Sequence, residues 1–291
     1  MEEELLSLTD IIKNTINDIL SQIFSSIDNN LYSILDTLAF VDTSILDNKN
    51  LLKILGTSPS EGILLLCNSL FFGFLIYYAA NYLISHFTLS KIDSPPQFIF
   101  KSIIFLIFMN SSNFICSQII NIISISSSFI LYIGETIFNK SISFTSFINS
   151  LNEISYVSTN SLDIFSFSGI IKSFISYGLI NILFSLALRY IMIQILILIC
   201  PFAFLSLVNS KSEWFFKSWL RCFVSLLLLQ ILISLILVVN LSINSINPAL
   251  SIILNIGTIY ALSYSNSYLK TLIGGFNTTI STNISYIKNS F

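Results

Sequence analysis

The chain has 291 residues, of which 54% are hydrophobic and 10% are charged, and its mean hydropathy is +0.84. Soluble globular domains carry charges at about a quarter of their positions, so this composition excludes an ordinary soluble fold and indicates a membrane protein. Ten of the 15 acidic residues but only three of the 13 basic residues lie in residues 1–61. The remainder is therefore mildly basic, which suits an anionic membrane and makes no case for nucleic-acid binding.

Residues 1–61 are predicted to form an acidic, amphipathic helical region outside the membrane. Apolar residues recur at steps of three and four over residues 3–25, a second helix is expected around 31–40, and a third around 51–55, where Gly56 ends it. This region either docks a partner or the membrane surface, or packs on the rest of the protein. Its acidic start lacks the basic segment of a signal peptide, so targeting is expected to depend on the first span.

A transmembrane helical domain is predicted over residues 62–268. Its first span covers about 62–84 and is followed by a loop in which Pro95 and Pro96 are expected to prevent helix on both sides. The apolar run at 98–138 is about twice as long as a bilayer requires. One long, kinked helix is favoured for this run over a bent pair with a re-entrant half.

The second half of this domain repeats the ambiguity. A loop at 139–168 is rich in Ser, Asn and Phe, and its phenylalanines are expected to rest on the membrane surface rather than to line a translocation path. The apolar run at 169–208 is again long enough for one or two crossings. Final spans are expected at 222–243 and 249–268, before a polar tail at 269–291. The predicted fold is thus an all-α polytopic membrane bundle with about five to seven spans.

An amphipathic cytoplasmic hinge is predicted at residues 209–221. Ser210 and Glu213 have the spacing of a capping box, so a helix should begin there. Glu213 and Lys217 form a favourable i, i+4 pair, and the two tryptophans are expected to lie at the lipid headgroups as an aromatic belt. The same surface would suit a docking partner. The hinge residues proposed for anchoring or assembly are Glu213, Trp214, Lys217, Trp219 and Arg221.

One charge, Arg189, lies deep in the run at 169–208. A charge at membrane depth costs a few kcal/mol and is by default functional or paired. If the run is a hairpin, Arg189 marks its turn. If the run is a single helix, Gln194, Gln230 and backbone carbonyls freed by Pro201 are the candidate partners.

Catalytic, cofactor-binding and metal-binding residues are not predicted anywhere in the chain. The four cysteines are scattered without metal-ligand spacing and are expected to be small core residues, and His86 is expected to be an interfacial polar residue. No cluster of acids or histidines suggests an enzyme, and no phosphate-binding loop suggests a motor.

Basic residues near the spans predict the orientation. The hinge, the loop with Lys91 and Lys101, and the tail with Lys270 and Lys288 are expected to be cytoplasmic. The N-terminus is then outside and the C-terminus inside.

A family resemblance can be stated for the stretch that begins at Arg189-Tyr190. An apolar run follows, then Pro201 with small and apolar residues after it, and then SEWFFKSWLRCFVSLLLLQ. This order resembles the TrbL-type polytopic membrane subunits of type IV secretion and conjugation machines, in the version of Gram-positive conjugative elements. The similarity covers residues 98–240 in layout and about 190–230 in residue pattern. The chain departs from the family in lacking a large hydrophilic domain.

The resemblance implies a non-enzymatic channel or scaffold subunit in the bacterial cytoplasmic membrane. Its implied partners are further copies of the chain, other machine subunits including cytoplasmic ATPases and a coupling protein, membrane lipid, and the DNA or protein that is passed. The alternative is a secondary transporter or another small-solute permease. Such proteins are expected to show inverted repeats, and the two long runs of this chain do not match in sequence.

Overall fold

The computed structural model describes residue 15 and residues 34–56, 58–88, 94–155, 167–209, 211–243 and 248–274. These residues contain no strand, which confirms the all-α class. After a helical stretch at 34–39, the elements are the 3-10 helix η1 (Thr43–Leu46), α2 (Lys49–Leu55), α3 (Gly62–Thr88), α4 (Pro95–Asn110), α5 (Ser112–Phe138), α6 (Phe144–Ser155), α7 (Phe167–Ser206), α8 (Glu213–Ile243) and α9 (Pro248–Ile273).

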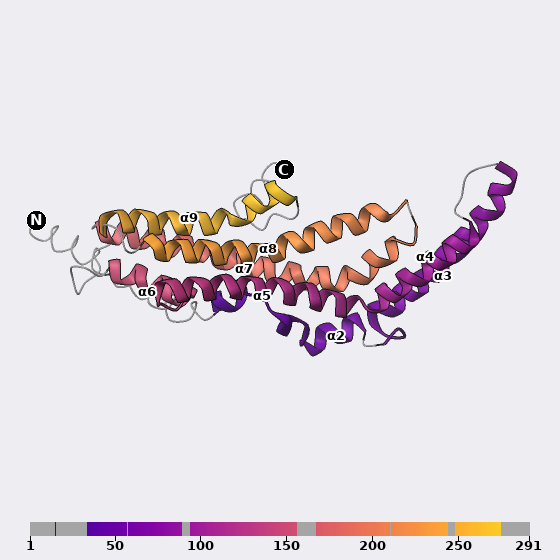
Figure 1. The fold of residues 1–291 in the computed structure, drawn as a ribbon, viewed down its shortest axis with the longest axis horizontal. Helices are drawn as coiled ribbons and strands as arrows, with labels where there is room; N and C mark the ends of the chain where they lie inside the picture. Colours follow the sequence, from indigo (N-terminus) through magenta and orange to yellow (C-terminus); the bar gives the residue numbers. More distant parts are fainter. Residues whose placement is uncertain are drawn as a thin grey trace, which may run out of the picture.

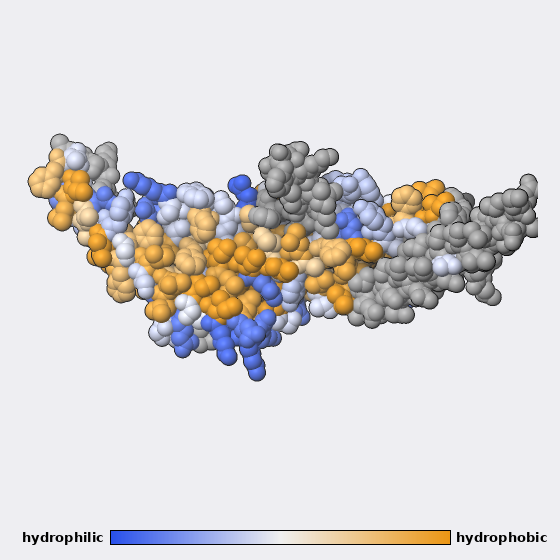
Figure 2. Space-filling view, turned by 180° about the vertical axis from the view of Figure 1, so that it is seen from behind, coloured by the Kyte–Doolittle hydropathy of each residue, from blue (hydrophilic) through white to orange (hydrophobic). Residues whose placement is uncertain are grey.

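The molecule is an elongated helical bundle with a two-helix arm. Figure 1 shows α5, α7, α8 and α9 along the long axis, while α3 and α4 leave one end of the bundle together. The turn between α7 and α8 lies at the arm end, and α6 lies at the opposite end. Figure 2 shows a broad apolar surface along the bundle and a compact hydrophilic patch at one edge, on the side where η1 and α2 lie.

Four of the described helices are long and apolar enough to cross a membrane, at Gly62–Thr88, Ser112–Phe138, Gly169–Ser206 and Glu213–Ser242. This number is lower than the five to seven predicted.

Helix α9 occupies the predicted last span but is not among the four, because its sequence carries many polar residues. Several of them are buried against α8, where Asn240 Nδ2 donates to Asn255 Oδ1 (2.6 Å) and to Thr258 Oγ1 (3.0 Å).

The apolar run at 98–138 forms two helices, α4 and α5, that meet at Ser111, so the run bends there as expected but is not one continuous helix. The prediction that Pro95 and Pro96 prevent helix on both sides is wrong on the C-terminal side, because α4 begins at Pro95. Proline is tolerated in the first helical turn, where its missing N–H has no intrahelical acceptor. At the other end of α4, Asn68 of α3 donates to Asn110 Oδ1 at 3.2 Å and ties the arm together.

Helix α7 runs without interruption for 40 residues and passes through Pro201. The hairpin alternative for this run is therefore wrong, and Arg189 lies in the middle of a helix rather than at a turn.

The predicted loop at 139–168 contains a helix, α6. Its side chains Phe144 and Phe147 are 0% and 5% exposed, so the prediction that they rest on the membrane surface is wrong. Asp36 accepts a hydrogen bond from the Phe144 backbone N–H at 2.8 Å and one from Thr145 Oγ1 at 3.2 Å. The carboxylate thereby satisfies a free N–H at the start of α6, and α6 in turn packs beside the N-terminal segment.

The described part of the N-terminal region packs on the bundle. Leu35 and Ala39 are fully buried in a core that also contains Phe144 and Leu186. This is the second of the two alternatives left open for residues 1–61. Helix α2 ends at Gly56, whose φ of 97° is in the left-handed region, as predicted for a helix stop. Apart from residue 15, which is helical, the helix predicted at 3–25 lies outside the described residues, as does most of the polar tail.

Candidate functional site

Arg189 is the most deeply buried charge in the described part of the chain, at 0% exposed. Its Nε donates to the Leu226 carbonyl at 2.8 Å, and its Nη1 donates to the Ala39 and Leu38 carbonyls at 2.9 and 3.4 Å. Its Nη2 donates to Gln230 Oε1 at 3.2 Å. Helix α7, helix α8 and the N-terminal segment therefore meet at one guanidinium.

The physical basis of this arrangement is the match between a rigid donor and helix carbonyls. Leu38 and Ala39 lie at the end of the helical stretch 34–39, where backbone carbonyls lack intrahelical partners. The negative end of a helix dipole favours a cation, and a guanidinium has five donors in a fixed fork. None of the described carboxylates forms an ion pair with Arg189. Oriented carbonyls and one amide therefore solvate the charge.

The network extends from Arg189 to a third long helix. Gln230 Nε2 donates to Ser127 Oγ of α5 at 3.2 Å, and Ser127 Oγ donates to the Ser124 carbonyl at 2.9 Å. Ser127 is 1% exposed and Gln230 is fully buried. The polar layer thus connects α5, α7, α8 and the segment 34–39.

This layer lies at the junction of the two hydrophobic cores of the bundle. On α7, Leu186 belongs to the core beside α6 and α9, whereas Ile193 belongs to the core beside the arm. On α8, Leu229 belongs to the core beside α6 and α9, and Leu226 belongs to the core beside the arm. Arg189 and Gln230 therefore fix the register of the helices at the point where one apolar core gives way to the other.

Part of this network follows from the sequence. Gln230 was named as a partner, and the structure confirms it. Gln194 and the carbonyls freed by Pro201 do not serve this role. Leu38 and Ala39 were missed because they contribute backbone carbonyls, which carry no residue-type signal.

The hinge residues separate into an exposed and a buried group. Glu213 and Lys217 form the predicted i, i+4 ion pair at 2.9 Å, and α8 begins at Glu213. Trp214 is 66% exposed. Arg221 is also exposed, and its Cδ packs against Gly274 at the end of α9. Ser210, the predicted cap, lies outside the described residues.

Trp219 does not join an aromatic belt. It is 3% exposed, its Nε1 donates to the Leu196 carbonyl at 2.8 Å, and its ring stacks on Phe223 with centroids 5.3 Å apart. The indole lies on the face of α8 that contacts α7, so it acts as a core anchor between those helices. Trp214 lies on another face of α8 and is exposed.

Three of the four cysteines, scattered in sequence, lie in one core. Cys67, Cys116 and Cys200 come from α3, α5 and α7 and are fully buried in the same apolar core. Cys200 Sγ also donates to the Ser112 carbonyl at 3.8 Å. Among the described residues there is no group of three or more His, Cys, Asp or Glu side chains that would hold a metal ion. These thiols pack as small apolar groups.

Comparison with protein-family models, curated proteins and solved structures finds no match to this chain.

Proposed function

We propose that this chain is a channel or scaffold subunit of a multiprotein translocation machine of the type IV secretion class. The observation that supports the proposal is the set of hydrogen bonds that the buried guanidinium of Arg189 makes. The guanidinium donates to three backbone carbonyls and one amide oxygen of the described residues, so the charge holds the bundle together and does not face a solute path. The TrbL-like order of residues around Arg189 and Pro201 supplies the class of machine.

The arm supports a role within an assembly. Many large apolar side chains of α3 are exposed, among them Phe72 (64%), Ile76 (72%) and Phe87 (88%). The bundle covers little of this helix, so lipid and neighbouring subunits contact it instead. At the turn between α7 and α8, the exposed Trp214, Glu213 and Lys217 offer a polar and aromatic surface to a cytoplasmic ATPase or coupling protein.

A permease remains the second candidate because of the break between α4 and α5. Discontinuous helices form the substrate and ion sites of many transporters. Here the break at Ser111 lies next to the Asn68–Asn110 pair. A permease that uses this break would depend on those two amides for uptake of its solute.

Deletion of the gene in a donor cell separates the two candidates. We expect loss of conjugative transfer or of secretion, with small-solute uptake unchanged, and recovery on complementation with the intact chain. Purification in mild detergent should also recover an ATPase with the protein. Normal transfer combined with loss of uptake of a defined solute would overturn the proposal in favour of the permease.

A further inference from the structure

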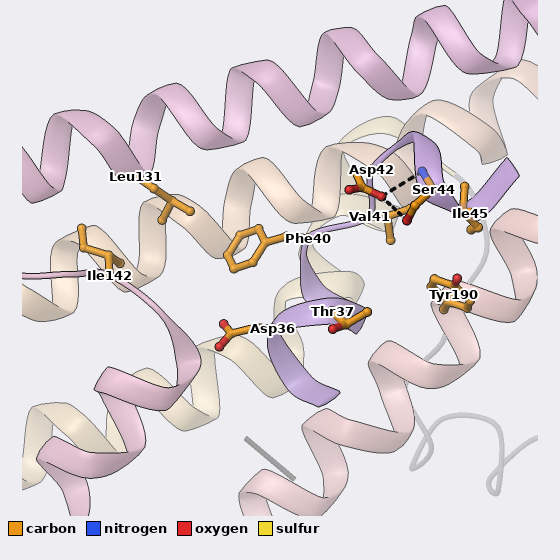
Figure 3. A pocket seen from close by; sticks show the side chains of 10 residues that line it. All are labelled: Asp36, Thr37, Phe40, Val41, Asp42, Ser44, Ile45, Leu131, Ile142 and Tyr190. Atoms are coloured by element: carbon orange, nitrogen blue, oxygen red, sulfur yellow. Dashed lines mark hydrogen bonds between the residues drawn. The ribbon is translucent and has the colours of Figure 1, made fainter. Parts of the chain in front are cut away.

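A pocket of about 390 Å³ lies between the N-terminal segment, α5, the start of the α6 region and α7. In the view of Figure 3, Phe40 lies between Asp36 and Asp42, and Tyr190 forms the wall on the α7 side. Ser44 and Thr37 contribute hydroxyl groups. The volume is within the range of small-ligand sites, which begins at about 300 Å³.

The charge of the pocket wall is negative. Asp36 and Asp42 both line it, and none of the other lining residues that the structure describes is basic. Arg189 precedes Tyr190 in the chain, but its guanidinium is bound to carbonyls inside the bundle and is not part of the wall. Glu135, which accepts from the Ile142 N–H at 2.9 Å, adds a third acid just beyond the wall.

Both carboxylates keep capacity for a ligand. Asp42 Oδ1 accepts from the backbone N–H and from the hydroxyl of Ser44, and Oδ2 has no hydrogen-bond partner among the described residues. Each oxygen of Asp36 accepts one hydrogen bond, from Phe144 N–H and from Thr145 Oγ1. Because an ionised carboxylate has about four acceptor sites, each acid has room for a further donor. Neither acid forms an ion pair within the described residues.

Five of the described lining residues are apolar. Phe40, Val41, Ile45, Leu131 and Ile142 line the pocket beside the acids. A hydrated inorganic ion would gain nothing from this surface. A cation that carries a hydrocarbon body would gain from both parts, since the ammonium binds carboxylates and aromatic faces while the body displaces water from apolar side chains.

We propose that this pocket binds a small organic ammonium ion, with its charged group at Asp36 or Asp42 and its hydrocarbon body against Phe40 and Leu131. The proposal goes beyond the translocation role and does not depend on it. A ligand in this position contacts the same segment that solvates Arg189 through Leu38 and Ala39, so binding would favour the docked form of the N-terminal segment.

The test is calorimetric titration of the purified full chain in detergent with phenethylammonium. Two control ligands are used. 3-Phenylpropionate carries a similar ring but the opposite charge, and K⁺ is a cation that has no hydrocarbon part. We expect saturable binding of phenethylammonium only. Equal heats for the ammonium and the carboxylate would show partition into detergent or protein without recognition, and would overturn the proposal.

Matched variants locate the site. Asp42→Asn keeps a side chain able to cap η1, and we expect it to weaken phenethylammonium binding at least tenfold. Asp47→Asn, an acid of the same segment that does not line the pocket, should bind as the original chain does. Leu131→Trp should abolish binding by filling the cavity without a change of charge. If Asp42→Asn does not fold, Asp36→Asn replaces it. Unchanged affinity in the folded acid variant and in Leu131→Trp would overturn the proposal.

Discussion

At Arg189, one side chain holds together three separate parts of the chain, and its removal tests this directly. In Arg189→Leu the Leu38 and Ala39 carbonyls lose the guanidinium that donates to them, and a buried group left unpaired costs about 1–3 kcal/mol. We expect the segment 34–46 to detach while the helices of the bundle persist. Ala39 is fully buried in the original chain. A cysteine introduced there (Ala39→Cys) should therefore react with a maleimide only when Arg189→Leu is also present.

The background for this experiment replaces Cys222, which is partly exposed, by alanine. Lys217→Met is the matched control, because it also removes one positive charge but at an exposed position. It should leave Ala39→Cys unreactive. Protection of Ala39→Cys in the Arg189→Leu protein would contradict the role given to the arginine.

The two tryptophans provide a second test at the scale of single residues. Trp219→Phe keeps an aromatic ring for the stack on Phe223 but removes the indole donor to the Leu196 carbonyl. We expect a loss of about 1 kcal/mol, the typical net value of one hydrogen bond, and somewhat more if the carbonyl is left unpaired. Trp214→Phe, at an exposed site, should be neutral. Thermal unfolding in detergent, followed by near-ultraviolet circular dichroism, measures both; equal effects would contradict the assignment of Trp219 to the core.

At the scale of elements, α7 and α9 approach closely where α7 has a glycine. A Cβ added at Gly178 would lie 2.3 Å from Ile259 Cγ2, whereas a Cβ added at Gly257 of α9 would meet nothing within 4 Å. Alanine in a helix is favoured over glycine by about 1 kcal/mol, but overpacking costs about 1–3 kcal/mol. Gly257→Ala should therefore stabilise the protein slightly and Gly178→Ala should destabilise it, as measured by the midpoint of thermal unfolding. A gain in both variants would show that α7 and α9 do not pack as described.

Elements were predictable from the sequence where local chemistry decides them. Gly56 ends α2 because a positive φ is needed there, and Glu213 pairs with Lys217 because they lie one turn apart. Tertiary packing decided the rest. Pro201 lies inside α7, α9 buries its amides against α8, and Phe144 is covered by the N-terminal segment. No local pattern reveals such partners, since Asn240 and Asn255 are 15 residues apart and Asp36 and Phe144 are 108 residues apart.

The candidate site shows the same division. The depth of Arg189 and the choice of Gln230 followed from the cost of a charge in an apolar run. The pocket beside it did not, because its wall joins residues 36–45 to Leu131, Ile142 and Tyr190. Only the docking of the N-terminal segment brings these together.

At the scale of the whole molecule, the bundle has two ends that should lie on opposite sides of the membrane. The turn between α7 and α8, with Lys211, lies at the arm end, and the turn between α5 and α6, with Lys140, lies at the other end. The positive-inside rule assigns the first turn, which precedes Lys217 and Arg221, to the cytoplasm. Single cysteines at positions 211 and 140 test this assignment in a chain whose four natural cysteines are replaced by alanine.

In intact cells, a membrane-impermeant maleimide should label Lys140→Cys and not Lys211→Cys, whereas permeabilised cells should show labelling of both. Both positions are exposed, so protection reports the membrane side rather than burial. Labelling of Lys211→Cys alone in intact cells would reverse the orientation and remove the hinge as a surface for a cytoplasmic ATPase. Labelling of both in intact cells would mean that the long helices do not separate these turns across the bilayer. The proposed translocation role requires the first pattern, because its motor partners act from the cytoplasm.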